Sequence, residues 1–352
     1  MSRFFSKRFC SLKAYVPGEQ PTDMKYVKLN TNESPYQPSK GVLDAVKNEA
    51  LTLNLYSDPT AGKLKNKAAE IFNVKPENVF LSNGSDEALS FAFMAFCDKD
   101  NGIIFPKISY GFYKVFAELY NLPYRQIPLA ENFSINITDY CDQNSNIVIA
   151  NPNAPTGLCL TLEQIEKIVV TNKEKLVIID EAYIDFGGES CIPLTKKYDN
   201  LLVVGTFSKS RSLAGARLGY AIGNESIIND LETIKYSTNP YNINRLTLEA
   251  GFFALCDNDY YMDNCKKIIE TRTYTADVLK SLGFTVLDSK TNFVFAMPNK
   301  ISGKDFYLKL KEKGVLVRHF NDEKISDFVR ITIGTKQQMD ILIEKTKEIL
   351  KG

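Results

Sequence analysis

The chain has 352 residues, and 44% of them are hydrophobic, which is enough to bury one large core and a smaller second one. Its 43 basic and 42 acidic residues nearly cancel, so no overall charge points to nucleic acid or to an anionic membrane as a partner. The 7 cysteines are scattered and odd in number, and the single histidine is His319, so we expect reduced thiols and no metal site.

The N-terminal region offers no targeting signal. Residues 1–15 contain no continuous apolar run of signal-peptide length, and no later stretch approaches a membrane span. We therefore expect a cytoplasmic protein whose partners are small molecules.

Short apolar runs alternate with amphipathic stretches through the first two thirds of the chain. These runs lie at residues 78–81, 102–105, 146–150, 176–179 and 201–207. Such alternation predicts an α/β fold in which a mostly parallel sheet is flanked by helices.

The pattern changes after Tyr241, where a long polar–apolar helix pattern covers residues 244–282. Strands are predicted at 283–287, 292–296, 315–318 and 328–333, and a closing helix at 337–350. We assign these elements to a second, smaller α+β domain, residues 244–352, which follows a large domain at residues 41–243.

A glycine turn joins a predicted strand to a predicted helix at residues 79–89. Free amides at such a helix start can cradle a phosphate group, so Gly84, Ser85, Asp86 and Glu87 are candidate ligands. The alternative is that Ser85 only caps the helix, while the two carboxylates complement the helix dipole.

Two later strands end in chemically active side chains. Asp180 and Tyr183 follow the strand at 176–179, and Lys209 follows the strand at 201–207. Ligands of open α/β sheets bind at the carboxyl ends of strands, so these three side chains are expected to share a site. A lysine held there can form a Schiff base with a carbonyl compound.

Thr206, Ser208 and Arg217 add two hydroxyls and a bidentate cation, which suit a phosphate group. Together with the lysine and the carboxylate they match the requirements of pyridoxal 5′-phosphate. Tyr110 follows the strand at 102–105 and could stack on a flat cofactor. Each residue also has an ordinary alternative, such as a helix cap for Asp180 or core packing for the tyrosines.

We therefore predict a pyridoxal-phosphate enzyme. The alternative from another class is a non-catalytic protein that binds a phosphorylated ligand at the turn of residues 84–87.

With these residues in view, the chain resembles the fold-type I aminotransferases nearly end to end, and within them the histidinol-phosphate aminotransferase family. The motifs that carry the resemblance are residues 15–21, 29–36, 56–59, 151–157, 180–183, 208–209 and 330–335. The resemblance implies a large domain with a seven-stranded, mostly parallel sheet, and an N-terminal arm, residues 1–40, that forms part of the small domain.

The resemblance also implies roles for single residues. Lys209, Asp180 and Tyr183 are expected to be catalytic, with Asp180 on the cofactor's ring nitrogen and Tyr183 on its hydroxyl. Tyr110 is expected to stack on the ring. The family is homodimeric, and Tyr56 is expected to reach the cofactor phosphate of the partner subunit.

The expected substrate site comprises Tyr15, Asn32, Arg318 and Arg330, with the two arginines holding the substrate anion. One position departs from the family, because Ala154 stands where an asparagine usually precedes Pro-Thr-Gly. Asn153 is adjacent, but it is expected to point the other way in an extended segment.

The activity that the resemblance implies is amino transfer between L-histidinol phosphate and 2-oxoglutarate, which yields imidazole-acetol phosphate and L-glutamate in histidine biosynthesis. An aromatic amino acid aminotransferase or a threonine-phosphate decarboxylase on the same scaffold is the alternative, because cofactor motifs do not distinguish these reactions.

Overall fold

The computed structural model describes residues 2–10 and 12–351. Its larger part is built on a sheet of 7 strands in the order β2-β8-β7-β6-β5-β3-β4. The strands are β2 Val79–Ser82, β3 Ile103–Pro106, β4 Tyr124–Ile127, β5 Asn146–Ala150, β6 Val177–Asp180, β7 Leu201–Thr206 and β8 Gly219–Ile222. All neighbours pair in parallel except β8, which runs antiparallel to both β2 and β7.

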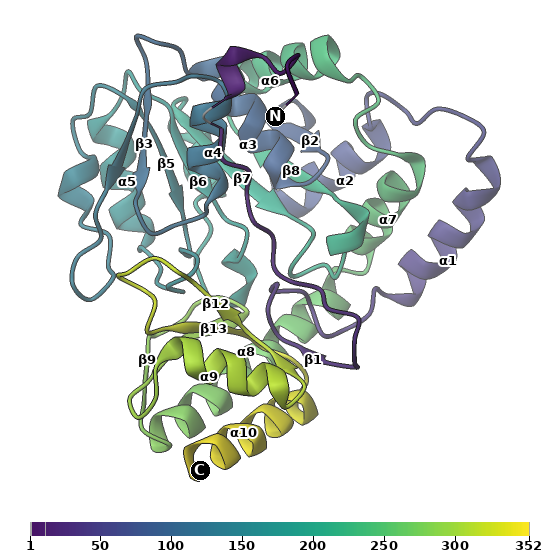
Figure 1. Ribbon diagram of the computed structural model, residues 1–352. Coiled ribbons are helices and arrows are strands. Elements are labelled where there is room, and N and C mark those ends of the chain that lie inside the picture. The colour runs from purple at the N-terminus through teal and green to yellow at the C-terminus, as the bar shows by residue number, and fades with distance from the viewer. Residues whose placement is uncertain (1, 11, 352) are drawn as a thin grey trace.

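Helices cover both faces of this sheet (Figure 1). They are α1 Lys40–Glu49, α2 Gly62–Phe72, α3 Ser85–Phe96, α4 Phe112–Leu119, α5 Leu162–Thr171, α6 Glu225–Thr238 and α7 Arg245–Cys256. Alternate residues of a strand face opposite sides, so Ile179 packs in the core under α2, α5 and α7, whereas Ile178 packs under α3, α4 and α6. This two-sided burial explains why the strands read as continuous apolar runs.

The smaller part holds an antiparallel sheet in the order β12-β13-β10-β9 and a parallel pair, β1 with β11. Its elements are β1 Val27–Lys28, α8 Asn258–Ser281, β9 Phe284–Val286, β10 Phe293–Pro298, α9 Gly303–Glu312, β11 Val315–Leu316, β12 Arg318–His319, β13 Val329–Thr332 and α10 Lys336–Lys351. In Figure 1 these elements lie below the large sheet, and the N-terminal segment runs down to join them at β1.

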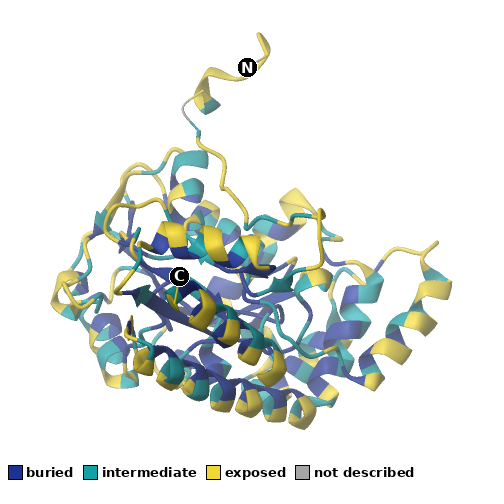
Figure 2. Cartoon of the chain, turned by 60° about the horizontal axis from the view of Figure 1, so that its bottom comes forward, coloured by how far each residue is buried: buried dark blue, intermediate teal, exposed yellow. Residues whose placement is uncertain are grey.

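Short 3-10 helices complete the secondary structure. They are η1 Lys7–Phe9, η2 Ala50–Thr52, η3 Pro76–Asn78, η4 Ile137–Tyr140, η5 Ile184–Phe186, η6 Ile192–Lys196 and η7 Ala214–Ala216. Figure 2 shows the buried inner faces of the helices and their exposed outer faces, as the amphipathic sequence patterns require.

The structure corrects two sequence predictions. The helix expected over 244–282 is two helices, α7 and α8, which meet at Asp257. The residues around the break are polar and favour helix ends over helix interiors. The strand expected over 315–318 is also divided, because β11 pairs with β1 whereas β12 pairs with β13.

The two helices pack in different places. Ala250 and Ala254 of α7 lie in a core of the large sheet, whereas Cys265 and Ile268 of α8 lie in the core of the small one. We therefore propose that the boundary between the domains falls within α8 rather than at residues 243–244.

Within residues 2–10 and 12–351, no helix combines the length and apolarity that crossing a membrane requires.

Candidate active site

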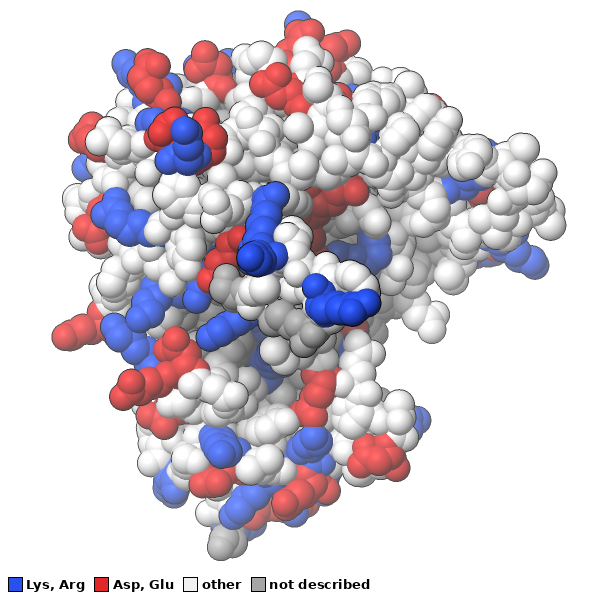
Figure 3. Space-filling model, turned by 45° about the horizontal axis from the view of Figure 1, so that its top comes forward, with Lys and Arg blue, Asp and Glu red and all other residues white. Residues whose placement is uncertain are grey.

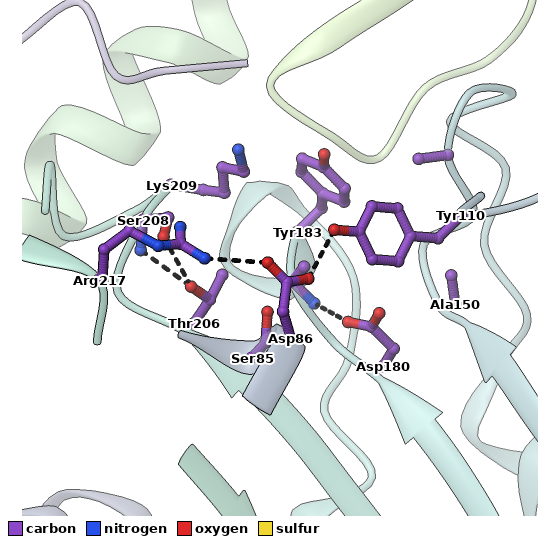
Figure 4. Close-up of a pocket in the computed structure, with 12 residues that line it drawn as sticks. Ser85, Asp86, Tyr110, Ala150, Asp180, Tyr183, Thr206, Ser208, Lys209 and Arg217 are labelled. Carbon is purple, nitrogen blue, oxygen red and sulfur yellow. Dashed lines mark hydrogen bonds and ion pairs between the residues drawn. The ribbon is translucent and has the colours of Figure 1, made fainter. Parts of the chain in front are cut away.

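A pocket lies at the carboxyl ends of β5, β6 and β7 (Figure 4). Most of the side chains that the sequence singled out for a cofactor line it. The lining residues are Ser85, Asp86, Tyr110, Ala150, Ala154, Asp180, Ala182, Tyr183, Thr206, Ser208, Lys209 and Arg217. They converge because parallel strands bring the loops after them to one edge of the sheet.

Lys209 stands just beyond β7 and lines the pocket between Arg217 and Tyr183 (Figure 4). The amine Nζ donates to the Thr31 carbonyl at 3.4 Å and lies 6.0 Å from the centre of the Tyr183 ring. Removal of water from the amine, and secondly repulsion by Arg330, lower the pKa of Lys209 to about 8. With a pKa of about 8, roughly a tenth of the amine is unprotonated at pH 7, and this fraction can act as a base or a nucleophile.

Asp180 is the last residue of β6 and is only 4% exposed. Its Oδ2 accepts from the Tyr113 hydroxyl at 2.8 Å, and its Oδ1 accepts from the Ala182 N–H at 3.1 Å. Burial raises the pKa of Asp180 to about 6, although both hydrogen bonds oppose the rise. The carboxylate is thus mostly ionised at neutral pH and can hold a positive charge in the pocket.

The turn between β2 and α3 forms the second wall. Gly84, rather than Ser85, is the N-cap of α3, and its φ of +76° is a conformation that favours glycine. Asp86 accepts from Arg217 Nη2 at 2.9 Å through Oδ2 and from the Tyr110 hydroxyl at 2.6 Å through Oδ1. These contacts, drawn in Figure 4, fix a cation and an aromatic ring beside the helix start.

Backbone packing keeps this wall close to the sheet. A Cβ atom at Gly219 would lie 2.3 Å from the Ser85 nitrogen, so only glycine lets β8 approach the turn. Across the pocket, the Ser208 N–H donates to Thr206 Oγ1 at 3.1 Å, which holds both hydroxyls beside Arg217.

These residues fit pyridoxal 5′-phosphate. The helix start with Arg217 and the two hydroxyls suits a phosphate, Tyr110 provides a flat face, Asp180 suits a protonated ring nitrogen, and Lys209 supplies the amine. A cluster of metal-ligating side chains was found nowhere in the described part of the chain.

A second cavity adjoins the first and shares Tyr110, Ala154, Tyr183 and Lys209 with it. Arg318 and Arg330 both line this cavity and stand opposite each other, because β12 and β13 pair at that position. Tyr15 and Asn32 line it as well. The structure therefore brings the four expected substrate residues together beside Lys209.

The two arginines differ in their surroundings. Arg318 donates from Nη1 to the Pro17 carbonyl and from Nη2 to the Val16 carbonyl, each at 3.1 Å. Arg330 donates from Nη2 to the Asn30 carbonyl at 3.1 Å, and burial lowers its pKa. Among the described residues, Arg330 Nε is buried without a hydrogen-bond partner, so this guanidinium retains a donor.

Two sequence candidates, Glu87 and Tyr56, lie elsewhere. The Glu87 carboxylate accepts from Asn83 N at 2.7 Å and from Asn242 Nδ2 at 2.6 Å, and it is not among the described lining residues. Tyr56 is 80% exposed and stacks on Tyr241 at 4.7 Å, away from the pocket of its own chain. Asn153 is buried, donates to the Ile108 carbonyl and accepts from the Ser109 hydroxyl, and it is not among the described lining residues, whereas Ala154 is.

Sequence reasoning missed Tyr113 and Thr31. Tyr113 lies one helical turn after Tyr110 on α4, and this spacing is the only signal that could have found it. No sequence signal places Thr31 against Lys209, because 178 positions separate them.

The model of the family described as aminotransferase class I and II matches residues 24–345. The histidinol-phosphate aminotransferase of Brachyspira hyodysenteriae (strain ATCC 49526 / WA1) is 54% identical over 354 residues, which cover 100% of both chains. That of Clostridium beijerinckii is 48% identical, covering 100% of this chain and 99% of the relative.

Solved structures resemble the chain as well. The crystal structure of histidinol-phosphate aminotransferase from Sinorhizobium meliloti in complex with pyridoxal-5′-phosphate superposes with a TM-score of 0.89 at 22% identity. The match covers 100% of this chain and 98% of the other and shows a shared fold.

Proposed function

Because the chain belongs to the aminotransferase class I and II family, we propose that it transfers the amino group of L-histidinol phosphate to 2-oxoglutarate with pyridoxal 5′-phosphate as cofactor. The observation that carries the substrate is the 54% identity, over the full length of both chains, with a histidinol-phosphate aminotransferase. The structure supports it by placing two arginines beside the lysine pocket, where a phosphate monoester and a dicarboxylate both need cations.

When bound, pyridoxal phosphate supplies an electrophilic carbonyl and an electron-withdrawing ring. Lys209 holds the cofactor in the resting state and moves the proton at the substrate α-carbon through its Nζ. Its pKa of about 8 suits both directions of that transfer. Asp180 keeps a negative charge in the pocket, and Tyr113 and the Ala182 N–H orient its carboxylate.

The remaining residues bind and orient. Gly84, Ser85 and Asp86 at the start of α3, with Thr206, Ser208 and Arg217, hold the phosphate of the cofactor. Tyr110 would stack on its ring, and Tyr183, which accepts a hydrogen bond from Asn32 Nδ2 at 2.9 Å, would bind the ring hydroxyl. Arg318 and Arg330 bind the substrate anion. Tyr15 lines the same cavity, and its ring centre lies 4.5 Å from that of Phe112.

We also propose a homodimer in which Tyr56 serves the partner's site. Three leucines just before Tyr56 are strongly exposed. The exposed fraction is 85% for Leu51, 57% for Leu53 and 57% for Leu55. Such a cluster is typical of a protein interface.

We also propose that the protein acts in the cytoplasm. Its cysteines are scattered along the chain and odd in number, which favours reduced thiols over a set of disulfide bonds.

The substrate proposal is tested by amino-transfer assays with L-histidinol phosphate, phenylalanine and threonine phosphate offered separately to the same preparation. We expect the highest kcat/KM with histidinol phosphate. Equal or higher values with phenylalanine, or release of carbon dioxide from threonine phosphate, would contradict the proposal.

The role of Lys209 is tested independently of the substrate. Borohydride reduction of the protein with its bound cofactor, followed by peptide mapping, should place the label on Lys209. Label on another lysine would remove the basis of the mechanism.

A further inference from the structure

The N-terminal segment supplies the hydrogen-bond partner of the Lys209 amine. Among the described residues, the Thr31 carbonyl is the one acceptor within hydrogen-bond distance of Nζ, at 3.4 Å. The next residue, Asn32, has a φ of +58°, a left-handed conformation that asparagine tolerates better than most residues. The chain therefore turns sharply where its carbonyl faces the lysine.

An ion pair holds this turn from its outer side. Lys28 Nζ donates to Glu33 Oε1 at 2.6 Å and to Thr31 Oγ1 at 2.7 Å. The Thr31 hydroxyl in turn donates to Glu33 Oε2 at 2.5 Å. Lys28, Thr31 and Glu33 thus form a closed set of contacts, called the turn clamp below, around the residue whose carbonyl meets Lys209.

The turn clamp is anchored in the small domain. Lys28 belongs to β1, which pairs with β11, and the Thr332 N–H of β13 donates to the Leu29 carbonyl at 2.9 Å. The Asn32 N–H donates to Thr332 Oγ1 at 3.0 Å, and Asn32 Nδ2 donates to the Tyr183 hydroxyl at 2.9 Å. The position of the Thr31 carbonyl is therefore fixed relative to the small domain and to Tyr183, which lines the pocket.

The charges around Lys209 give the turn clamp an electrostatic effect. Arg330 and Arg217 disfavour the protonated amine, whereas Glu33 and Asp86 favour it. Asp86 is already paired with Arg217 at 2.9 Å. Glu33 is likewise paired with Lys28, so the turn clamp carries no net charge and its carboxylate only moderates the effect of Arg330.

We propose that Lys28 and Glu33 are positioning residues, which fix the Thr31 carbonyl against the amine of Lys209. This inference rests on the proposed role of Lys209 as the lysine that holds the cofactor and moves the proton. In that role, the amine must return to the same position each time the cofactor leaves it for the substrate. The fixed Thr31 carbonyl defines that position.

The test measures the pKa of the Lys209 amine in the full-length protein loaded with pyridoxamine 5′-phosphate, which has no carbonyl to bond the lysine. Brief labelling with acetic anhydride at a series of pH values, followed by peptide mass spectrometry, gives the titration of this single lysine. Glu33→Gln should lower its pKa by about half a unit to one unit, because the turn clamp opens and the Thr31 carbonyl is no longer held as an acceptor for the protonated amine. Glu33→Asp, which keeps the charge, should lower it less.

Lys25→Met is the matched control, since Lys25 is exposed and lies three residues before Lys28 in the same segment. This variant should leave the pKa of Lys209 at the parental value. A parental pKa in Glu33→Gln, or an equal shift in Lys25→Met, would overturn the proposal. The measurement requires no substrate, so a failure to transfer the amino group of histidinol phosphate would leave its result unaffected.

Discussion

At the scale of single residues, the pairing of Arg318 with Arg330 bears most directly on specificity. Arg330 donates to the Asn30 carbonyl, and its Nε has no partner among the described contacts. Arg318 donates instead to the main-chain carbonyls of Val16 and Pro17. Arg318 can thus exchange main-chain acceptors for a substrate anion without leaving a buried charge unpaired. We therefore assign the phosphate of the substrate to Arg318 and the α-carboxylate of glutamate to Arg330.

Arg318→Ala should accordingly reduce kcat/KM for histidinol phosphate by an amount equivalent to roughly 2 to 4 kcal/mol, because a desolvated anion loses its partner. The loss for glutamate should be smaller, since Arg330 remains. Steady-state kinetics of both half-reactions measure the difference. Arg125→Ala, at an exposed arginine on β4, is the control and should leave both values unchanged. Equal losses for the two donors would contradict the assignment.

Glu181 offers a test of burial rather than of catalysis. It is 2% exposed, accepts from Ser190 Oγ at 2.6 Å and from the Cys191 N–H at 2.7 Å, and burial raises its pKa to about 7. A carboxyl whose folded pKa is raised contributes stability that is complete below its unfolded pKa and is lost as the pH rises through the folded value.

Glu181→Gln is neutral at every pH and should therefore gain stability over the parent as the pH rises from about 5 to 8. The expected gain at pH 8 is roughly 1 to 3 kcal/mol in the free energy of unfolding. Urea titrations at both pH values measure it. Glu189→Gln changes an exposed carboxylate nearby and should show no such trend. A constant difference between parent and Glu181→Gln across this range would exclude the burial effect.

At the scale of elements, the turn from β2 to α3 depends on a glycine. Gly84 has a φ of +76°, and a Cβ atom there would lie 2.6 Å from Arg217 Nη2. Alanine therefore strains the backbone and pushes the guanidinium away from the helix start that is proposed to hold phosphate.

Gly84→Ala should lower the free energy of unfolding by about 1 to 2 kcal/mol and weaken cofactor affinity as well. Denaturant titration and cofactor binding followed by visible absorbance measure the two effects. Gly215→Ala is the control, because no described atom lies within 4 Å of a Cβ atom at that position. If Gly84→Ala binds the cofactor as tightly as Gly215→Ala, the turn has no role in phosphate binding.

At the scale of the whole molecule, charge and apolar surface point to different kinds of contact. Lysines, arginines and carboxylates are interspersed over the face shown in Figure 3, so that face carries no large patch of one sign. The exposed residues Leu51, Leu53, Leu55 and Tyr56 are apolar or aromatic by contrast. A second copy of the chain is the proposed partner of this segment.

The dimer predicts complementation between two damaged subunits. In a heterodimer of Tyr56→Phe and Lys209→Ala chains, action across the interface places both lesions in one site and leaves the other intact. Mixed dimers, separated by different affinity tags, should then bind the cofactor at one site with parental affinity. Weak binding at every site would mean that Tyr56 acts within its own subunit.

The sequence by itself determined the α/β fold and the family. Strands such as Val177–Asp180 can be recognised in the sequence as continuous apolar runs, because both faces of a parallel sheet are buried. The reactive side chains stand at the ends of these runs. Local order along the chain therefore predicted which residues stand at the carboxyl edge of the sheet. The same logic missed β4, whose first residues are exposed, and the antiparallel β8.

Only the tertiary structure decided which distant segments meet at that edge. It directed Tyr113 onto Asp180 and brought Thr31 to Lys209. These contacts depend on how the small domain and the N-terminal segment pack against the sheet, and packing joins residues whose separation along the chain leaves no periodic signal in the sequence.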